Sequence, residues 1–235
     1  MMVDPWYLPI FINNRDRVTY TAMLVKWLRE AGYHQITILD NDSKYEPLLE
    51  WYEENPFQVE IIKFGRNYGK NSLWASGLAG QIVSPFVFTD PDIVPIEECP
   101  TDCVAILLEL AKMLGHKVGL GLKLDDLPDH YGPKALVEKW ESHIPQYRIR
   151  YAGGYPILKA GTDTTFAIYP DPKAAFTIEP AARTGAPLLA RHMPWYEDSS
   201  NPTEENLFYE SRSKTTSWGV TECKSVAVTH YCKKG

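Results

Sequence analysis

Two aspartates separated by one residue, Asp90 and Asp92, are the residues of this chain whose types and spacing most directly suggest chemistry. They follow the run 85–89, whose apolar composition is typical of a buried strand. A strand that ends there would place both carboxylates at one edge of a sheet. Carboxylate oxygens favour Mg2+ or Mn2+, and these ions usually complete their shell with water and with nucleotide phosphates. The pair therefore predicts a site for a metal-bound diphosphate.

The tripeptide alone is a weak signal, because Asp-Pro-Asp is also common in turns. Its position is the stronger indication. Three earlier strand-like segments, 8–12, 36–39 and 59–63, also end in polar residues, and helical patterns at 21–31, 46–54 and 72–80 separate the strands. Alternating strands and helices predict a parallel sheet, and ligands bind at the carboxyl ends of such strands.

The second half of the chain predicts a less regular arrangement. A helix is expected over 101–114 with Thr101 as its cap, then a strand over 117–124, then a helix over 133–142 that begins with Pro133. Segments 151–156 and 164–169 predict paired strands around a glycine-rich turn, with Asp163 at the start of the second. The sheet is therefore expected to become mixed here, and a short helix is expected near 204–210.

Length and composition favour one domain over residues 1–235, with halves at about 1–98 and 99–235, because 44% hydrophobic residues are ample for one core. A net charge of -6 argues against a nucleic-acid partner. No secretory signal or membrane span is evident, so a soluble, cytoplasmic protein is expected. The cysteines are expected to be reduced, and zinc at Cys99 and Cys103 would need two further ligands. The remaining two are Cys223 and Cys232.

The order and spacing of these motifs over residues 8–198 resemble the GT-A class of nucleotide-sugar glycosyltransferases, especially its family-two-like members. The segments that carry the resemblance are Ile12-Asn13-Asn14-Arg15-Asp16-Arg17, Asp40-Asn41-Asp42-Ser43, Asn67-Tyr68-Gly69 and Asp90-Pro91-Asp92. The resemblance implies a GT-A, Rossmann-like α/β fold with a mostly parallel central sheet, helices on both faces and a small antiparallel extension on the acceptor side. Residues 1–98 would bind the nucleotide sugar, and residues 99–235 would form the acceptor half with a C-terminal lid.

The same resemblance implies roles for single residues on the donor side. Asp92 would bind Mn2+ or Mg2+ directly, and Asp90 would reach the ribose, the sugar or the metal's water. Asp40 or Asp42 would contact the nucleoside, and the loop with Asn67 and Gly69 would close over base and ribose. The full donor-binding set is Asn13, Arg15, Arg17, Asp40, Asp42, Asn67, Gly69, Lys70 and Asp90. The expected metal ligands are Asp90, Asp92 and His192.

On the acceptor side, the resemblance favours Asp163 as the general base of an inverting transfer, with Asp125, Asp126 and Glu197 as rivals. The Glu-Asp pair of family-two inverting enzymes has no clean counterpart before Asp163, which leaves the stereochemistry open. His192 either ligates the metal or packs beneath a loop. Similarly, aromatic residues 195 and 196 either stack on an acceptor sugar or complete a core.

The implied partners are a nucleotide-diphosphate sugar, with uridine diphosphate favoured as the commonest choice in the class, and a glycan or glycosylated acceptor. Two alternatives remain. One is a catalytically silent nucleotide- or glycan-binding module. The other is a sugar-phosphate nucleotidyltransferase, although that class usually has a glycine-rich loop after its first strand and Asn13-Asn14-Arg15-Asp16 contains no glycine.

Overall fold

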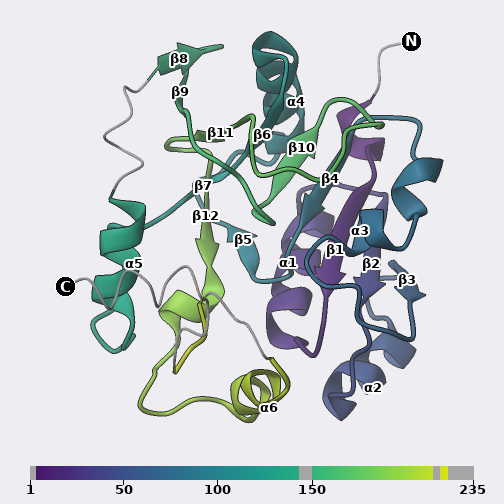
Figure 1. The fold of residues 1–235 in the computed structure, drawn as a ribbon, viewed down its shortest axis with the longest axis vertical. Coiled ribbons are helices and arrows are strands. Elements are labelled where there is room, and N and C mark those ends of the chain that lie inside the picture. The colour runs from purple at the N-terminus through teal and green to yellow at the C-terminus, as the bar shows by residue number, and fades with distance from the viewer. Residues whose placement is uncertain (1–3, 143–149, 214–217, 222–235) are drawn as a thin grey trace.

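The computed structural model describes residues 4–142, 150–213 and 218–221, so Cys223 and Cys232 lie outside the described residues. Within them, a sheet with the strand order β3-β2-β1-β4-β10-β6-β11-β9-β8 forms the centre, and β5, β12 and β7 form a second, smaller sheet (Figure 1). The strands are β1 (Ile10–Asn14), β2 (Ile36–Asp40), β3 (Glu60–Lys63), β4 (Phe86–Thr89), β5 (Ile93–Pro95), β6 (Lys117–Gly119), β7 (Gly121–Leu122), β8 (Arg150–Ala152), β9 (Tyr155–Leu158), β10 (Ala167–Tyr169), β11 (Ala181–Thr184) and β12 (Leu189–His192).

The first four strands are parallel, as the alternating pattern predicts. β1 pairs with both β2 and β4, and β2 pairs with β3, in parallel register throughout. Asn14 lies opposite Asp40, so the polar residues after β1 and β2 meet at the same edge. The crossovers contain α1 (Thr19–Glu30), α2 (Glu46–Glu54) and α3 (Ser72–Ala75). The helix expected over 72–80 stops early because Gly77 has a φ of 84°, and a 3-10 turn, η2 (Leu78–Gln81), follows.

The second half of the sheet is mixed, as expected, but the predicted pairing of 151–156 with 164–169 is wrong. β8 pairs with β9 around Gly153 and Gly154, whose φ values of 56° and 86° suit a tight turn. β10 lies instead between β4 and β6 and is antiparallel to both. All three residues of β10 are buried and apolar in character, which suits a central strand better than a hairpin at the edge.

The strand expected over 117–124 is divided between the two sheets. β6 belongs to the large sheet and β7 to the small one, with Leu120 between them. At Gly121 a Cβ atom would lie 2.1 Å from the carbonyl oxygen of Thr184, so only glycine allows the chain to cross β11 this closely. This crossing ends the strand early.

Helices cover both faces of the large sheet. Alternate residues of β1 divide between them: Ile10 and Ile12 pack in the core beneath α1, α2 and α4 (Cys103–Leu114), whereas Phe11 packs on the face covered by α3 and η2. Thr101 does not cap α4. Its carbonyl accepts a hydrogen bond from the Tyr33 hydroxyl at 2.6 Å. Likewise, Pro133 is the N-cap of α5 (Lys134–Glu141), not its first residue.

The remaining elements are η1 (Pro5–Tyr7), η3 (Met193–Tyr196) and α6 (Glu204–Arg212). α6 confirms the helix expected near 204–210, and the Thr203 hydroxyl caps it by accepting from the Asn206 amide at 3.2 Å. None of the described helices has the length and apolar character needed to cross a bilayer. The coarse expectation of an α/β chain with a mostly parallel central sheet is confirmed.

Candidate functional site

Asp90 lies where β4 ends and contacts both halves of the chain. Its amide donates to the Thr164 carbonyl at 2.8 Å, and the Thr164 hydroxyl donates to its carboxylate. From β1, the Asn13 amide nitrogen lies 3.5 Å from the other carboxylate oxygen, and the Ser72 hydroxyl fixes the Asn13 side chain at 2.7 Å. Burial raises the pKa of Asp90 well above its ordinary range, and the nearby Asp92 adds to this. A cation at this position would therefore offset the electrostatic cost of burying the charged form of Asp90.

Asp92 and His192 face each other from β-segments of the small sheet. Asp92 directly precedes β5, His192 ends β12, and the two strands are antiparallel with Ile93 opposite His192. The His192 Nε2 atom lies 3.7 Å from Asp92 Oδ2. Burial lowers the pKa of His192, so the ring is neutral at pH 7, which is the form that binds metals. Two predicted metal ligands are thus neighbours.

These residues fit a divalent cation. Asp92 Oδ1 and His192 Nδ1 are buried, and neither has a hydrogen-bond partner among the described residues. A different pair of atoms of the same side chains, His192 Nε2 and Asp92 Oδ2, lies 3.7 Å apart. No cluster of three or more His, Cys, Asp or Glu side chains that could hold a metal occurs in the described ranges. Asp92 and His192 alone would be an incomplete ligand set, which phosphate oxygens and water would have to complete.

The two acids at the end of β2 and just after it differ in burial: Asp40 is buried, and Asp42 is partly exposed. Asp40 is 4% exposed and accepts from the Ser43 amide at 3.2 Å and from the Tyr52 hydroxyl at 3.1 Å. Asn14 donates to the same hydroxyl at 2.9 Å. Asp42 instead has a φ of 67° and forms an ion pair with Lys44 at 2.7 Å, which lowers its pKa. Of the two predicted nucleoside contacts, only Asp42 has a carboxylate that is open to a ligand.

Asp16, after β1, is the centre of a second buried network. It is fully buried, and one carboxylate oxygen accepts from the amides of Lys44 and Tyr45, which ties the β1 loop to the β2 loop. The other oxygen lies 3.0 Å from Arg212 Nε and 3.7 Å from Arg15 Nε. Arg15 also donates to the Arg212 carbonyl at 3.5 Å. Arg15 is therefore held by Asp16 and by the end of α6.

Arg17 is buried to 2% exposure, which the sequence does not predict for a cation. Its guanidinium stacks 3.8 Å from the ring centre of Tyr209 and 5.1 Å from that of Tyr20, and it donates to the Asn206 side chain. Its charge contributes to the lowered pKa of His192, so the two groups are electrostatic neighbours. The Nε atom of Arg17 has no partner in the described part of the chain.

The loop after β3 is attached to β2 by a residue that sequence reasoning missed. Asn41 is 3% exposed; its side chain accepts from the Tyr68 amide at 2.6 Å and donates to the Gly69 carbonyl at 2.9 Å. The Asn67 side chain accepts from the Gly69 amide at 2.7 Å, which closes a tight turn where Gly69 has a φ of 79°. Asn41 lies within the quoted Asp-Asn-Asp-Ser segment, but nothing in that pattern reveals its long-range partner.

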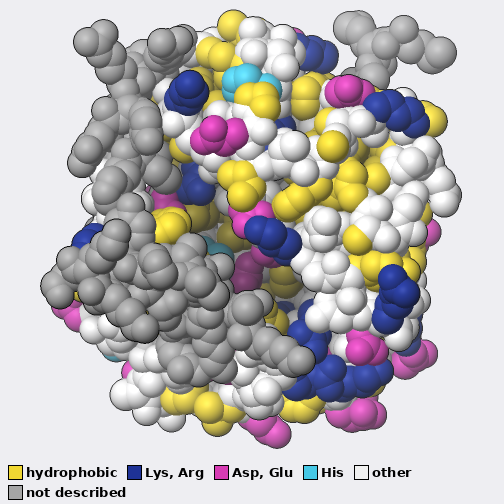
Figure 2. Space-filling view, in the orientation of Figure 1, with side chains coloured by type: hydrophobic (Ala, Val, Ile, Leu, Met, Phe, Trp, Pro, Cys, Tyr) yellow, Lys and Arg dark blue, Asp and Glu magenta, His cyan; other side chains and the backbone are white. Residues whose placement is uncertain are grey.

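Asp163 reaches this loop from the other half of the chain. Its Oδ2 atom forms an ion pair with Lys70 at 2.7 Å, and its buried Oδ1 atom has no hydrogen-bond partner among the residues described. It lies four residues before β10, in a loop, and not at a strand start as expected. The neighbouring Thr164 contacts Asp90, so Asp163 and the Asp90–Asp92 pair share one end of the sheet. On the face in Figure 2, acidic and basic side chains lie together in a hollow near the middle of the view.

The three rival acids differ in their surroundings. Asp125 is 79% exposed and pairs with Lys123 at 2.8 Å. Asp126 is held by Arg191 at 2.6 Å and by the Tyr196 hydroxyl at 2.6 Å, so its carboxylate is already engaged. Glu197 accepts from the Tyr20 hydroxyl at 3.1 Å, and both its charge and that of Asp92 act on Tyr20. Glu197 and Asp92, one of the predicted metal ligands, are thus both electrostatic neighbours of Tyr20.

The two aromatic residues after His192 are part of the protein interior. Trp195 is 1% exposed, and its ring centre lies 4.7 Å from that of His192 and 6.0 Å from that of Trp218. The Tyr196 hydroxyl lies within hydrogen-bond distance of the Asp126 carboxylate, at 2.6 Å, and of the Lys123 carbonyl, at 3.1 Å. Trp195 therefore supports the His192 ring from behind, and its burial leaves no face for stacking on a sugar.

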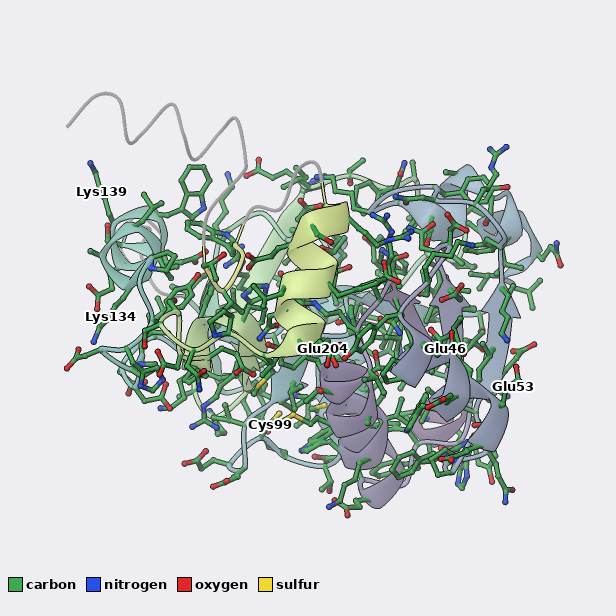
Figure 3. All side chains as sticks on the ribbon, turned by 90° about the horizontal axis from the view of Figure 1, so that it is seen from below. Glu46, Glu53, Cys99, Lys134, Lys139 and Glu204 are labelled. Atoms are coloured by element: carbon green, nitrogen blue, oxygen red, sulfur yellow. The ribbon has the colours of Figure 1, made fainter. Side chains whose placement is uncertain are left out.

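α6 lies over the site, and this arrangement was not evident from the sequence. Glu205 accepts from the amide and hydroxyl of Thr19 at the start of α1, at 3.0 Å and 2.8 Å, and Arg212 donates to the Asp42 carbonyl at 3.4 Å. Seen from below, α6 lies in front of the sheet, with Glu204 beside the start of α1 (Figure 3). The helix therefore covers the ends of β1 and β2.

The sequence matches no protein-family model, and no curated protein matches it at a significant level. Solved structures with a similar arrangement include the mannosyltransferase PcManGT from Pyrobaculum calidifontis in complex with GDP-Man and Mn2+, at 12% identity and a TM-score of 0.45, covering 87% of this chain and 61% of that one. Residues 1–349 of S. aureus TarS give 12% identity and a TM-score of 0.37, covering 62% of this chain and 52% of that one.

A third similar structure is a UDP-glucose pyrophosphorylase complexed with UDP-glucose, at 12% identity and a TM-score of 0.34, covering 97% of this chain and 88% of that one. This chain thus spans less than two thirds of the mannosyltransferase and of the TarS fragment. At these scores the similarities assign neither a family nor an activity, so the functional argument rests on the geometry of the site.

Proposed function

We propose that this chain is a metal-dependent glycosyltransferase with a GT-A-type fold, which moves a sugar from a nucleoside-diphosphate sugar to a hydroxyl group of a glycan or other acceptor. One observation carries the proposal. Asp92 and His192 each present a buried, unpaired ligand atom, and they do so at the edge where Asp90 and Asp163 also converge. Other buried side-chain atoms of the described residues, such as Arg17 Nε and Asn206 Nδ2, are also unpaired, so the proposal depends on two residue types that bind metals meeting at this edge.

In this proposal Asp92 and His192 hold Mn2+ or Mg2+, with Asp90 as a direct or water-mediated ligand. The metal, when bound, supplies Lewis-acid stabilisation of the charge on the departing diphosphate. His192 is kept in place by Trp195 behind it and by the Asp92 carbonyl, which accepts from the Met193 amide at 2.8 Å. The ligand atoms therefore need little rearrangement, which keeps the cost of binding low.

The proposed donor site lies in residues 1–98, at the ends of β1, β2 and β3. Arg17 supplies a buried positive charge beside His192, suited to a diphosphate. Asp42 and the loop with Asn67, Gly69 and Lys70 would contact the nucleoside. Asp40 is better described as a buried support for the loop after β2, because both of its oxygens are already hydrogen-bonded to Ser43 and Tyr52. Uridine diphosphate remains the nucleotide favoured by the resemblance.

The acceptor would bind in residues 99–235, with Asp163 as the general base. The Asp163 carboxylate would take the proton of the acceptor hydroxyl while the hydroxyl oxygen forms a bond to the anomeric carbon and the bond to the diphosphate breaks. Attack from the face opposite the diphosphate inverts the anomeric centre.

A thermal-shift screen of nucleotide-diphosphate sugars, each with and without Mn2+, tests this proposal, followed by a transfer and donor-hydrolysis assay with the best ligand. A rise in Tm that needs both metal and donor, together with release of nucleoside diphosphate, is expected. Pyrophosphate release from a nucleoside triphosphate would identify a nucleotidyltransferase instead. Donor binding with neither transfer nor hydrolysis would identify a silent binding module.

A further inference from the structure

The loop that carries Asp163 is held through its own peptide groups by two strands and by the residue that follows a third strand. The Gly161 carbonyl accepts from Arg183 Nε of β11 at 2.9 Å, and the Thr162 carbonyl accepts from Lys117 Nζ of β6 at 2.7 Å. On the other side of Asp163, the Thr164 carbonyl accepts from the Asp90 amide at 2.8 Å. The residues on either side of the proposed base are therefore fixed, whereas the Asp163 side chain is left 42% exposed.

Lys117 is an unusual residue for this task because it is buried to 5% exposure. Its three N–H groups match three acceptors: the Thr162 carbonyl, the Thr177 carbonyl and the Tyr169 hydroxyl at 3.3 Å. The ammonium also lies 5.1 Å and 5.7 Å from the ring centres of Tyr169 and Phe176. Burying a charge is costly, and apolar side chains often replace buried ions without loss of stability. Stability alone therefore gives little reason for a lysine here.

Arg183 makes the second contact from a similar environment. Its guanidinium pairs with Glu141 of α5 at 3.0 Å, and both side chains are largely buried, at 13% and 5% exposure. The pair leaves Nε free to hold the Gly161 carbonyl. Lys117 differs in that it has no carboxylate in contact among the described residues. The nearest acidic charge that acts on it is Asp163 itself.

We propose that Lys117 is a positioning residue for Asp163: it fixes the peptide before the base so that the carboxylate is directed at the reacting hydroxyl. This inference rests on the proposed function, because it concerns the same base. Lys117 does not touch substrate in this account. It acts on the rate of transfer and leaves donor binding unchanged, because no atom of Lys117 contacts the β1, β2 or β3 loops among the hydrogen bonds of the described residues.

The charge state of Lys117 gives a second consequence. Burial lowers the pKa of Lys117 to about 8, and the charge of Asp163 opposes this shift. The titratable groups that face it are Asp163 from the β9–β10 loop and Tyr169 from β10, and burial raises the pKa of Tyr169, so that phenol stays protonated. Above about pH 8 the Lys117 amine is neutral and keeps two N–H groups, one fewer than the three acceptors around it. The wild-type turnover number should therefore fall on the alkaline side near pH 8.

Lys117→Met is the decisive variant, since methionine has a similar length and packs well against the rings of Tyr169 and Phe176. Lys112→Met is the matched control, because Lys112 is 55% exposed on α4 and pairs only with Glu109 in the described structure. Three quantities are measured: kcat of transfer or donor hydrolysis from pH 6.5 to 9, the donor Kd with Mn2+, and amide hydrogen exchange over residues 160–166.

For Lys117→Met we expect kcat to fall by at least about tenfold, as for a base displaced by a fraction of an ångström. Donor Kd should stay within about twofold, exchange over 160–166 should rise, and the alkaline fall near pH 8 should disappear. Lys117→Gln, which keeps a neutral donor, should restore part of the rate. An unchanged kcat with unchanged exchange would overturn the proposal.

The test also separates this inference from the proposed function. If the wild type binds no donor with Mn2+, the proposed function fails, and the exchange measurement still decides whether Lys117 orders the loop. If the wild type transfers sugar and Lys117→Met does so equally fast, only the positioning role fails. Should Lys117→Met not fold, Lys117→Gln and the wild-type pH profile decide the question, and a wild-type rate that stays flat through pH 8 counts against the role.

Discussion

Two groups of acids lie at the carboxyl edge of the same sheet, and they differ in what surrounds their oxygens. Asp16 and Asp40 are buried, and their oxygens contact backbone amides, a tyrosine hydroxyl or an arginine. Asp92 is also largely buried, at 17% side-chain exposure, but its Oδ1 atom has no partner within the described residues and it faces a neutral histidine. The first group holds loops together, whereas the second has a place for a ligand.

The difference shows how residues of one type acquire different roles at one site. Asp16 and Asp40 both meet backbone amides that can satisfy them: the Lys44 amide donates to Asp16, and the Ser43 amide donates to Asp40. Asp90 and Asp92 are separated by a proline, which has no amide to donate, and they face partners from distant segments. In the proposed function, a cation is the partner of Asp92, whose Oδ1 atom has no hydrogen-bond partner among the described residues.

The largest expected effect concerns Asp163. Asp163→Asn should lower the transfer rate by about 10²–10⁴-fold, the usual contribution of a general base, with donor affinity nearly unchanged. Steady-state kinetics together with donor calorimetry measures both. Asp125→Asn is the control, because Asp125 is 79% exposed and far less constrained. If Glu197→Gln abolishes transfer and Asp163→Asn does not, the role of base passes to Glu197.

Substitution of the buried acids should instead lower the free energy of unfolding. Asp16→Ala removes the acceptor for two amides and the partner of Arg212, so the free energy of unfolding should fall by about 3–5 kcal/mol. Asp42→Ala, which breaks only the exposed pair with Lys44, should cost less than about 1 kcal/mol. Urea unfolding of both variants measures the contrast. Equal losses would contradict the division between a supporting and an exposed acid.

A smaller effect on stability is expected when the tyrosine hydroxyl that supports Asp40 is removed. Tyr52→Phe removes the hydroxyl that donates to Asp40 and accepts from Asn14, so both partners lose a hydrogen bond in the interior. The expected cost is about 1–3 kcal/mol in unfolding free energy. Donor Kd should change by less than about threefold, since Asp40 does not contact the nucleoside in this account. A large loss of donor affinity without loss of stability would instead indicate that Asp40 contacts the donor.

The parts of the fold that depend on local pattern could be predicted from the sequence. The strands before residue 90 and the helix at 46–54 follow from periodicity and polar ends, and the structure has them within two residues. The place of β10 between β4 and β6 could not be predicted, because no local signal states which strand a buried segment pairs with. The crossing at Gly121 likewise depends on a distant carbonyl.

The same limit applies to the site. Asp90, Asp92 and His192 could be selected because their residue types suit a metal, and the structure places Asp92 and His192 together. Lys117, Asn41 and the residues of α6 were missed, since their importance lies in contacts between segments far apart in sequence, such as Arg17 with Asn206. Arg17 was selected, but its burial between two tyrosines was not foreseen.

The central claim is that Asp92 and His192 bind a cation that in turn binds a diphosphate. Isothermal titration calorimetry of the wild type and Asp92→Asn with uridine, guanosine, cytidine and thymidine diphosphates, with and without Mn2+, tests it most directly. The account predicts that one nucleotide binds the wild type only with metal and that Asp92→Asn binds it at least about hundredfold more weakly. Binding that is equally tight without metal, or undiminished in Asp92→Asn, would contradict the account.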